Sequence, residues 1–363
     1  MSSSIGNILK VTIFGESHNT GIGMVIDGLP AGTIIYKNKI EQALKNRKVN
    51  NELSTSRQEQ DEVIFISGVL DNKTTGSPLA FIIKNSDVDS SGYEKGIIRP
   101  SHSDLTEYLK YNGFNDYRGG GFTSGRLTAS IIVLGTICGE ILPKHGVKVL
   151  SHIKSLHGIE DKKFSNFEQD KKTLEGAEYP VIDAEIRAKM INEIEQARKQ
   201  GDSVGGELET IIINTPIGLG EPYFDSVESY ISKAIFSIGG VKGISFGDAS
   251  IFKNGLGSEA NDQLRINKDK IEFLSNHAGG VNGGISNGEP IVFTTLVKPT
   301  PSISKVQKTI NVETKENIDL EIKGRHDPCI LHRVLPVVDA LTSFVLVDLM
   351  MLKESKNIWL STL

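Results

Sequence analysis

Short apolar runs, many alternating with polar residues and bounded by glycine, proline or asparagine, recur along the chain. Runs of this length and pattern are typical of β-strands. They predict strands over Val11–Phe14, Met24–Ile26, Val63–Ile66, Leu79–Ile83, Val147–Ile153, Glu207–Ile213, Gly243–Phe246, Pro290–Val297 and Ile318–Ile322.

Longer segments carry apolar residues at helical spacing. In the most charged of them, Ile186, Met190, Ile191 and Ile194 share one face, which indicates a surface amphipathic helix. The predicted helices are Lys39–Lys48 with Asn38 as its cap, Ser124–His145 ended by Pro143 and Gly146, Ala184–Lys199, Ser226–Ile238 ended by Gly239-Gly240, and a helix within the apolar run Cys329–Met351.

Helices and hairpin-like strands are mixed without the regular alternation of a doubly wound sheet. The pattern therefore favours an α+β layered architecture. Length alone suggests roughly two domains, or one large layered domain. The sequence has no credible linker and no evident repeat.

The net charge of the chain limits the kind of ligand that it can be expected to bind. The chain of 363 residues is 38% hydrophobic and has a net charge of -5, so no overall basic character attracts nucleic acid or an anionic membrane. The basic residues that matter must be local clusters, which suits a small anionic ligand.

Several features indicate a cytoplasmic protein. Cys138 and Cys329 both fall in apolar stretches and read as buried thiols in a reducing compartment. The N-terminus lacks the pattern of a signal peptide. The C-terminal apolar run contains charged residues and a proline, which argues against a membrane span: Arg333, Asp339, Asp348 and Pro336.

Gly324-Arg325-His326-Asp327-Pro328 places a cation, an imidazole and a carboxylate side by side just before the C-terminal apolar run. Proline suits the first helical turn, so we expect Asp327 at the N-cap, with Arg325 and His326 on the preceding loop. An ordinary helix start would look the same. The case for chemistry rests on the motifs upstream.

Two further motifs carry a histidine. Gly15-Glu16-Ser17-His18 follows the first predicted strand, where an imidazole can point into a cleft and act as a proton donor. In Arg99-Pro100-Ser101-His102-Ser103-Asp104, Arg99 could pair with an anion while His102 protonates a departing oxygen. A loop histidine bonded to backbone in the first motif, and a cap from Ser103 or Asp104 in the second, are the alternatives.

Tyr117–Arg126 reads YRGGGFTSGR, and its glycines would let the backbone approach a ligand closely. The helix predicted to begin near Ser124 would aim its N–H groups at that ligand, and Arg126 would add an anion clamp. The alternative is a glycine hairpin before a capped helix, but the flanking arginines favour phosphate or carboxylate binding.

The remaining loops are less specific. Ser275–Gly284 is glycine-rich without a Rossmann fingerprint, Lys298–Ser302 offers a cation and hydroxyls on a rigid loop, and Gly201–Gly206 reads as a turn. The sequence has no zinc spacing, Walker A loop or nucleophile elbow.

Taken in order, GESH, RPSHSD, RGGGFTSGR, GDSVGG, SNHAGG with GGIS, KPTPS and GRHDP resemble the chorismate synthase family over nearly the whole chain. The resemblance implies one β-α-β sandwich domain over residues 1–363, with helices packed between antiparallel sheets, assembled as a homotetramer. It also implies a reduced-FMN-dependent lyase that eliminates phosphate from 5-enolpyruvylshikimate 3-phosphate to give chorismate.

The resemblance implies roles for individual residues as well. His18 would protonate the reduced flavin, His102 would assist phosphate departure, and Asp327 would help remove the ring hydrogen. Substrate contacts would come from Arg47, Arg99, Ser124, Arg126 and Arg325. Flavin contacts would come from Phe122, Thr123, Ser124, Gly239, Gly240, Gly283, Lys298, Pro299, Thr300, Pro301, Ser302 and Arg325. No metal is implied.

Two alternatives to an active enzyme remain. Phe122 and Gly239-Gly240 differ from the residues usual in the family, which would suit a homologue that only binds flavin or anionic metabolites. A flavin reductase would need a nicotinamide site, and the sequence shows no dinucleotide fingerprint. We therefore expect an external reductase, rather than the chain itself using NADPH, to reduce the flavin.

Overall fold

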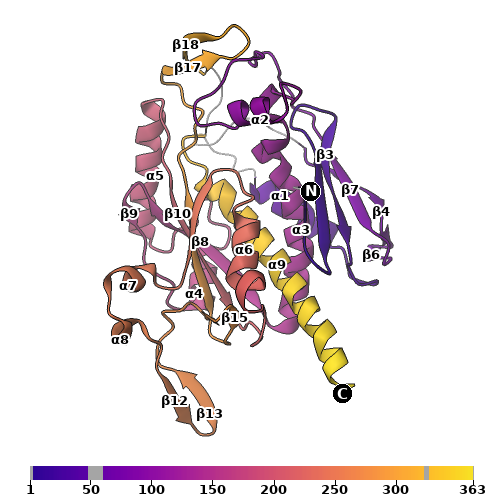
Figure 1. Ribbon diagram of the computed structural model, residues 1–363, viewed down its shortest axis with the longest axis vertical. Coiled ribbons are helices and arrows are strands. Elements are labelled where there is room, and N and C mark those ends of the chain that lie inside the picture. Colours follow the sequence, from indigo (N-terminus) through magenta and orange to yellow (C-terminus); the bar gives the residue numbers. More distant parts are fainter. Residues whose placement is uncertain (1–2, 48–59, 323–326, 363) are drawn as a thin grey trace.

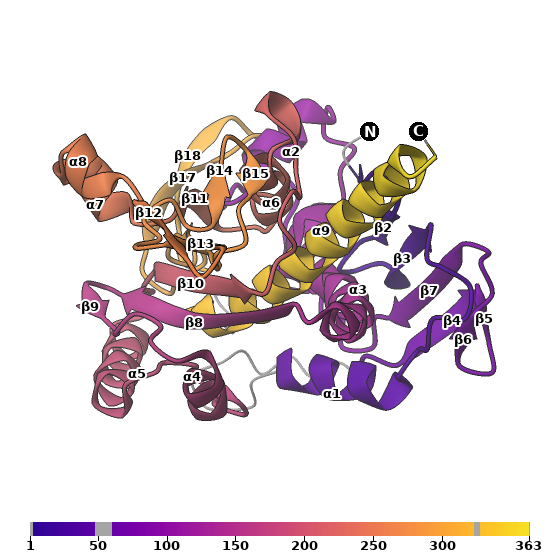
Figure 2. The ribbon, with the colours of Figure 1, turned by 90° about the horizontal axis from the view of Figure 1, so that it is seen from below.

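The computed structural model describes residues 3–47, 60–322 and 327–362. Two five-stranded antiparallel sheets lie on either side of two long helices (Figures 1 and 2). This arrangement confirms the predicted α+β layered sandwich. A continuous buried core joins residues from both sheets and both helices, from Leu9 to Leu349.

The first sheet comes from the N-terminal part of the chain. Along β7 the side chains of Leu79, Phe81 and Ile83 are buried and alternate with more exposed ones, which is the period of two expected of a strand with one covered face. The strands, in sheet order, are β1 (Ser4–Ile5), β2 (Lys10–Gly15), β3 (Gly21–Asp27), β7 (Leu79–Lys84) and β4 (Val63–Ser67).

The second sheet is built from the middle of the chain. Its strand β16 pairs on both sides and buries Ile291, Phe293 and Val297. The strands, in sheet order, are β11 (Val241–Phe246), β16 (Ile291–Val297), β10 (Gly206–Ile213), β8 (Lys148–Leu156) and β9 (Ile159–Glu160).

Helices α3 (Thr128–Ile141) and α9 (Leu331–Leu360) pack against each other between the sheets (Figure 2). Gly135 makes their close approach possible, because a Cβ at this position would lie 2.1 Å from the Cβ of Ala340. By length and composition, the stretches Arg118–His145 and Leu331–Leu360 could each cross a membrane, but most of the most apolar part of each stretch is buried inside the fold. Their apolar character is accounted for by the core.

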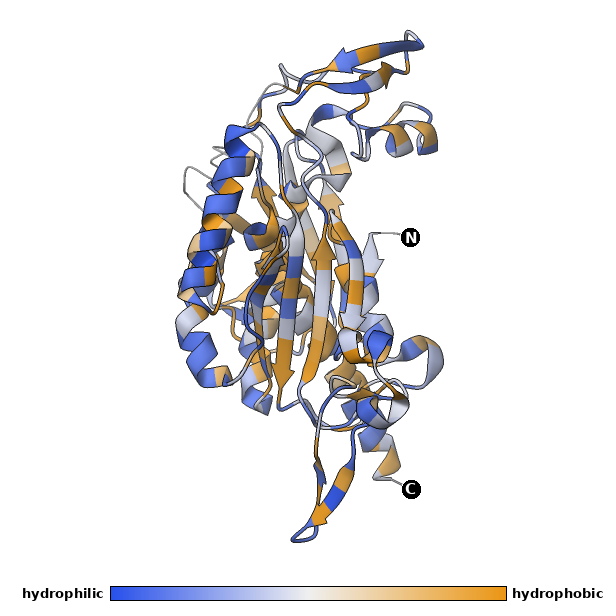
Figure 3. Cartoon of the chain, turned by 90° about the vertical axis from the view of Figure 1, so that its left-hand side faces the viewer, coloured by the Kyte–Doolittle hydropathy of each residue, from blue (hydrophilic) through white to orange (hydrophobic). Residues whose placement is uncertain are grey.

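Other helices cover the outside. The predicted helix α5 (Ala184–Lys199) is confirmed at both ends, and its outer side is largely hydrophilic (Figure 3). Helix α1 packs on α3, and α6 packs on α9. Their bounds are α1 (Lys37–Arg47), α2 (Asp104–Lys110), α4 (Phe167–Leu174), α6 (Val227–Ile235), α7 (Ala249–Asn254) and α8 (Gly257–Ala260).

Small hairpins complete the chain. The pair β17 (Gln307–Asn311) and β18 (Glu316–Leu320) lies beside residues 97–98, whereas β12 (Leu264–Asn267) and β13 (Lys270–Phe273) project from the opposite end (Figure 1). The others are β5 (Val69–Leu70) with β6 (Lys73–Thr74), and β14 (Val281–Asn282) with β15 (Ile285–Ser286).

Two predicted helix starts in the first half of the chain are wrong. Asn38 lies inside α1 rather than capping it, because the helix already begins at Lys37. Ser124 does not begin a long α-helix: its hydroxyl accepts from the backbone N–H of Arg126 and caps a short 3-10 turn, Gly125–Leu127, before α3 begins. A second 3-10 turn, Leu142–His145, follows α3.

The predicted start of the last helix is also wrong. Asp327 is not the N-cap and Pro328 is not in the first turn, since α9 begins at Leu331 after Ile330. The Pro328 carbonyl instead accepts a hydrogen bond from the backbone N–H of Val204, which ties this segment to the strand region. The described part of the motif is thus a loop that approaches the helix.

Both cysteines are buried thiols without a disulfide, as predicted. Cys138 lies in α3 and Cys329 just before α9. Burial raises the pKa of the Cys329 thiol to about 12, so this group stays protonated and unreactive near neutral pH.

Candidate active site

A cleft of about 2060 Å³ lies at the end of the sandwich where the glycine-rich loop, the α2 region and the start of α9 meet. Almost all the predicted site residues that the structure describes line it, although they come from segments far apart in the sequence. They are His18, Arg47, Arg99, His102, Phe122, Thr123, Ser124, Arg126, Gly239, Gly240, Lys298, Pro299, Thr300, Pro301, Ser302 and Asp327.

Two predicted residues are not among them. Arg325 lies outside the described residues. Gly283 lies in the turn between β14 and β15 and does not line the cleft. Its φ of 61° and that of 88° at Gly284 are the left-handed values that a tight hairpin turn requires, so the turn alone accounts for this glycine pair.

His18 is held on the loop between β2 and β3. Its Nε2 lies 3.2 Å from the carbonyl oxygen of Asp89, and its Nδ1 lies 3.0 Å from the hydroxyl of Ser17. A carbonyl can only accept, so Nε2 carries a proton and Nδ1 is the nitrogen that faces the hydroxyl. The ring of Tyr93 meets the imidazole edge-on, 5.1 Å away between centroids.

His102 forms a compact group with residues of its own motif. Its Nδ1 lies 2.7 Å from Oδ1 of Asp104, which also accepts from Arg99 at 2.7 Å. Burial alone would raise the pKa of the Asp104 carboxyl, but hydrogen bonds and charges from Arg99 and His102 hold it well below its usual range. Of the two residues considered as alternative caps, Ser103 occupies the N-cap position of α2 but makes no side-chain cap hydrogen bond, and Asp104 is the first residue of the helix.

The glycine-rich loop brings the two histidines together. A Cβ on Gly119 would lie 2.0 Å from Cε1 of His18, and a Cβ on Gly120 would lie 3.1 Å from Cε1 of His102. Both glycines also have positive φ, 61° and 90°. We expected these glycines to let the backbone approach a ligand. In the structure, their lack of a side chain lets the imidazole rings of His18 and His102 lie against the backbone of the loop.

The predicted anion-binding arginines that the structure describes, Arg47, Arg99 and Arg126, have partners within the chain. Arg126 is buried and pairs with Asp61, and it also donates to Asn85 and to the carbonyl of Lys84. Arg47 is buried as well and donates to the carbonyl of Gly125 at 2.9 Å. These contacts fix the positions of the guanidinium groups on the cleft wall.

Asp327 pairs with Arg333, an arginine that the sequence did not single out. Arg333 Nη1 donates to Asp327 Oδ2 at 2.6 Å, and both residues line the cleft. Because Arg333 lies in the first turn of α9, the ion pair anchors the loop carboxylate to the central helix. The sequence feature that could have pointed to this pair is an arginine six residues after the aspartate, in a run where charged residues are rare.

The loop after β16 forms another wall. Lys298 donates to the carbonyl oxygen of Ser101 at 2.6 Å, and burial together with the nearby charge of Lys242 lowers the pKa of its ammonium group. Thr300 Oγ1 is buried and has no hydrogen-bond partner among the described residues. A polar atom left unpaired beside a cleft is suited to binding a ligand.

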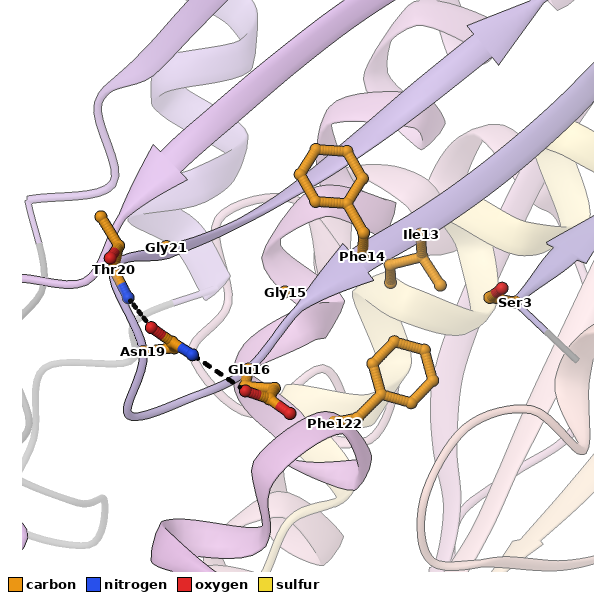
Figure 4. Close-up of a pocket in the computed structure, with 9 residues that line it drawn as sticks. All are labelled: Ser3, Ile13, Phe14, Gly15, Glu16, Asn19, Thr20, Gly21 and Phe122. Atoms are coloured by element: carbon orange, nitrogen blue, oxygen red, sulfur yellow. Dashed lines mark hydrogen bonds between the residues drawn. The ribbon is translucent and has the colours of Figure 1, made fainter. Parts of the chain in front are cut away.

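A shallower hollow of about 580 Å³ adjoins the cleft and shares Ile13 and Phe122 with it (Figure 4). Phe14, Phe122 and the Asn19–Glu16 hydrogen bond border it. It contains no imidazole and no cation, so the chemistry of the site belongs to the larger cleft.

The layered fold, the two imidazoles, the carboxylate and the surrounding cations define a site suited to acid–base chemistry on a small anionic molecule. The sequence profile of the family described as chorismate synthase matches residues 9–351. The chain therefore belongs to the chorismate synthase family.

Individual relatives agree with the family match. The chain is 43% identical over 352 residues to a chorismate synthase of Dehalococcoides mccartyi, covering 96% of both chains. It is 42% identical over 346 residues to one of Pyrococcus abyssi, covering 94% of this chain and 96% of that protein. A crystal structure of chorismate synthase superposes with a TM-score of 0.76 at 26% identity, covering 96% of this chain and 93% of that one.

Proposed function

We propose that the chain catalyses the anti-1,4-elimination of phosphate from 5-enolpyruvylshikimate 3-phosphate, giving chorismate with no net redox change. It would then be a carbon–oxygen lyase acting on phosphates, at the last common step of the shikimate pathway to the aromatic amino acids. The observation that carries the proposal is that His18, His102 and Asp327 line one cleft that is rich in cations. Membership in the family supplies the reaction.

The charge of the cleft suits this substrate, which carries a phosphate and two carboxylates. The chain as a whole has a net charge of -5, so this multiply charged anion must be attracted locally. The cations that line the cleft can do this, although carboxylates line it as well. The cations are Lys45, Arg47, Lys95, Arg99, Arg126, Lys242, Lys298 and Arg333, and the carboxylates are Asp61, Asp87, Asp89, Glu94, Asp104, Glu321 and Asp327.

Reduced FMN is the cofactor in this proposal, and the cleft residues fit it. The unpartnered hydroxyl of Thr300 and the cation of Lys298 are available on one wall, and Gly239 leaves open space because its missing Cβ would meet nothing closer than 4.0 Å. When bound, the reduced flavin supplies electron density while phosphate leaves and takes it back afterwards.

The residues of the chain would bind, orient and move protons. The Nε2 of His18 lies against the Asp89 carbonyl, and in this proposal the imidazolium form of His18 would give a proton to the reduced flavin and remain as a neutral imidazole. His102 delivers a proton to the departing phosphate oxygen, which lowers the negative charge that develops there. Asp327 is the candidate acceptor of the ring proton, and Arg333 holds its carboxylate in place.

We also propose that the chain assembles as a homotetramer. The register of β12 and β13 pairs Leu264 with Phe273 and Ile266 with Ile271, which places these four apolar side chains on one face of the ribbon. Ile266 and Ile271 are 73% and 69% exposed. A two-stranded ribbon with an uncovered apolar face is marginal in water, so a second copy of the chain is a suitable cover.

The decisive experiment is an anaerobic assay of the purified chain with dithionite-reduced FMN and 5-enolpyruvylshikimate 3-phosphate. We expect chorismate and inorganic phosphate in equal amounts, with no net oxidation of the flavin. Flavin binding without product would favour the non-catalytic homologue. In a parallel assay, steady NADPH consumption without an added reductase would show that the chain reduces its own flavin, against our expectation of an external reductase in the cytoplasm.

A further inference from the structure

Asp104 is the shared partner of Arg99 and His102. Arg99 donates from Nε to Oδ2 at 2.8 Å and from Nη2 to Oδ1 at 2.7 Å, and its backbone N–H donates to Oδ2 at 3.0 Å. His102 Nδ1 lies 2.7 Å from Oδ1. With side-chain exposures of 13%, 12% and 20% for Arg99, Asp104 and His102, the group is largely withdrawn from water.

The contacts of Nδ1 decide where the imidazole proton lies. Arg99 Nη2 is 3.2 Å away and can only donate, whereas the ionised carboxylate, 2.7 Å away, can only accept. An unprotonated Nδ1 would satisfy Arg99 but would face the carboxylate with its lone pair. A protonated Nδ1 makes the shorter, charge-assisted bond to Asp104, and Arg99 is already paired with the same carboxylate.

We propose that Asp104 is a positioning residue that keeps a proton on Nδ1 of His102 and thereby leaves Nε2 as the working nitrogen. Among the described residues, the polar contacts of the His102 side chain are all made by Nδ1: with Arg99, Ser103 and Asp104. Nε2 lies on the side of the ring toward Gly120, whose missing Cβ would approach it to 3.5 Å. The catalytic consequence rests on the proposed function; the proton assignment does not.

The proton balance is simple in this arrangement. As the bond between carbon and phosphate oxygen breaks, its electrons go to the oxygen, which takes the proton from Nε2 of the imidazolium. The imidazole left behind is neutral and already carries its remaining proton on Nδ1. No tautomer change is needed, and Asp104 stays ionised throughout.

The same geometry gives Arg99 a different role from the predicted substrate clamp. Its Nε and Nη2 both donate to Asp104, and its Cζ lies over the ring of Tyr93, 5.5 Å from the centroid. Arg99 therefore fixes the carboxylate that fixes the imidazole. Any contact of Arg99 with substrate must use its remaining donors.

The first test is spectroscopic and needs no turnover. In protein with ¹⁵N-labelled histidine, the His102 signals are assigned with a His102→Gln variant. We expect neutral His102 to be protonated on Nδ1 in the wild-type chain, and Asp104→Asn to shift it toward the Nε2-protonated form. Asp116→Asn is the matched control, because Asp116 makes a similar two-bond pair with Arg118 but none with a histidine. An unchanged tautomer in Asp104→Asn would overturn the proposal.

The second test is a kinetic double-mutant cycle. We expect Asp104→Asn to lower kcat at least about tenfold with little change in KM, and His102→Ala to lower it by ~10²- to 10⁴-fold. If Asp104 acts through His102, adding Asp104→Asn to His102→Ala has no further effect. Additive losses, or a rise in KM alone, would contradict a positioning role. A wild-type chain without activity would refute the proposed function but leave the tautomer test decisive.

Discussion

Asp104, Arg333 and Ser17 each hold one of the three proposed proton-transfer groups. The distances to His102, Asp327 and His18 are 2.7, 2.6 and 3.0 Å. Each holding residue comes from the same short segment as its partner or from the next element. The orientation of a reactive group is therefore set locally, and the glycine-rich loop then brings the two histidines together.

Gly119→Ala tests the role of that loop. The new Cβ would overlap the His18 ring at 2.0 Å, so we expect the imidazole to be displaced and turnover to fall by at least tenfold. The positive φ of 61° adds a folding cost of roughly 1–3 kcal/mol. Gly139→Ala in α3, where a Cβ meets nothing within 4 Å, is the control and should keep activity. If Gly119→Ala turned over as fast as the wild type, the position of the His18 imidazole in this structure would not matter for the reaction.

Asp327→Asn tests the proposed proton acceptor. We expect the fold and flavin binding to survive and turnover to drop by ~10²- to 10⁴-fold, because an amide cannot accept the proton. The helix-cap explanation of this residue no longer competes, since α9 begins at Leu331. Anaerobic turnover and flavin titration measure the two effects, with Asp319→Asn on the exposed side of β18 as the matched control. Equal activity of the two variants would remove Asp327 from the mechanism.

At the scale of elements, α9 does more than fill the core. Its buried Asp348 accepts hydrogen bonds from the backbone N–H groups of Asn7, Ile8 and Leu9, each at 2.9 Å. The carboxylate thus satisfies the turn between β1 and β2, where no strand partner is available to these groups. The charged residues that argued against a membrane span have specific tasks inside the fold.

Asp348→Asn should destabilise the chain by about 2–4 kcal/mol, because one of the two acceptor atoms becomes a donor facing buried N–H groups. Equilibrium unfolding in urea measures the loss. Glu354→Gln, on the exposed part of the same helix, is the control and should change stability little. A loss no larger than the control would mean that water replaces the carboxylate.

A second acid of α9, the partly buried Asp339, makes stability depend on pH. Burial raises the pKa of Asp339 from its ordinary 3.8 to about 6, although Ser151 donates a hydrogen bond to it. The unfolded chain releases this proton near 3.8 and the folded chain only near 6. The contribution of the group to stability is therefore full below pH 3.8, falls as pH rises toward 6, and remains low above it.

Asp339→Asn should abolish this fall. The variant should match the wild type near pH 4 and exceed its stability at pH 7.5 by on the order of 3 kcal/mol at most, following from the pKa difference. Urea unfolding at the two pH values measures this difference. Asp269→Asn, at the exposed tip of the β12–β13 ribbon, should show no such dependence. A variant no more stable than the wild type at pH 7.5 would show that the fold bears the ionised Asp339 without cost.

The elements also show what a sequence can and cannot predict. Periodicity located strands such as β7 and helices such as α5, because those residues face the core at regular intervals. The start of α9 was missed because the Pro328 carbonyl bonds to Val204, a contact that no local pattern encodes. Arg333 and Asp104 were missed as site residues for the same reason: their importance lies in what they touch.

At the scale of the whole molecule, the β12–β13 ribbon has apolar side chains that no other part of the single chain covers among the described residues. Its apolar face is exposed, while Arg265 and Glu272 pair across the other face at 2.8 Å. We expect the double change Ile266→Asp and Ile271→Asp to reduce the assembly in sedimentation velocity, with Arg265→Gln as a control on the opposite face. An unchanged sedimentation coefficient would mean that copies of the chain meet elsewhere.

The central position of α9 has a consequence for biosynthesis. Helix α9 is made after the elements that it packs against, α3, α6, β8 and β10. Until residues 331–349 emerge from the ribosome, the sides of these elements that face α9 and the N–H groups of residues 7–9 lack their partners. We expect the nascent chain to stay incompletely packed until α9 has been made, and to depend on chaperones during that interval.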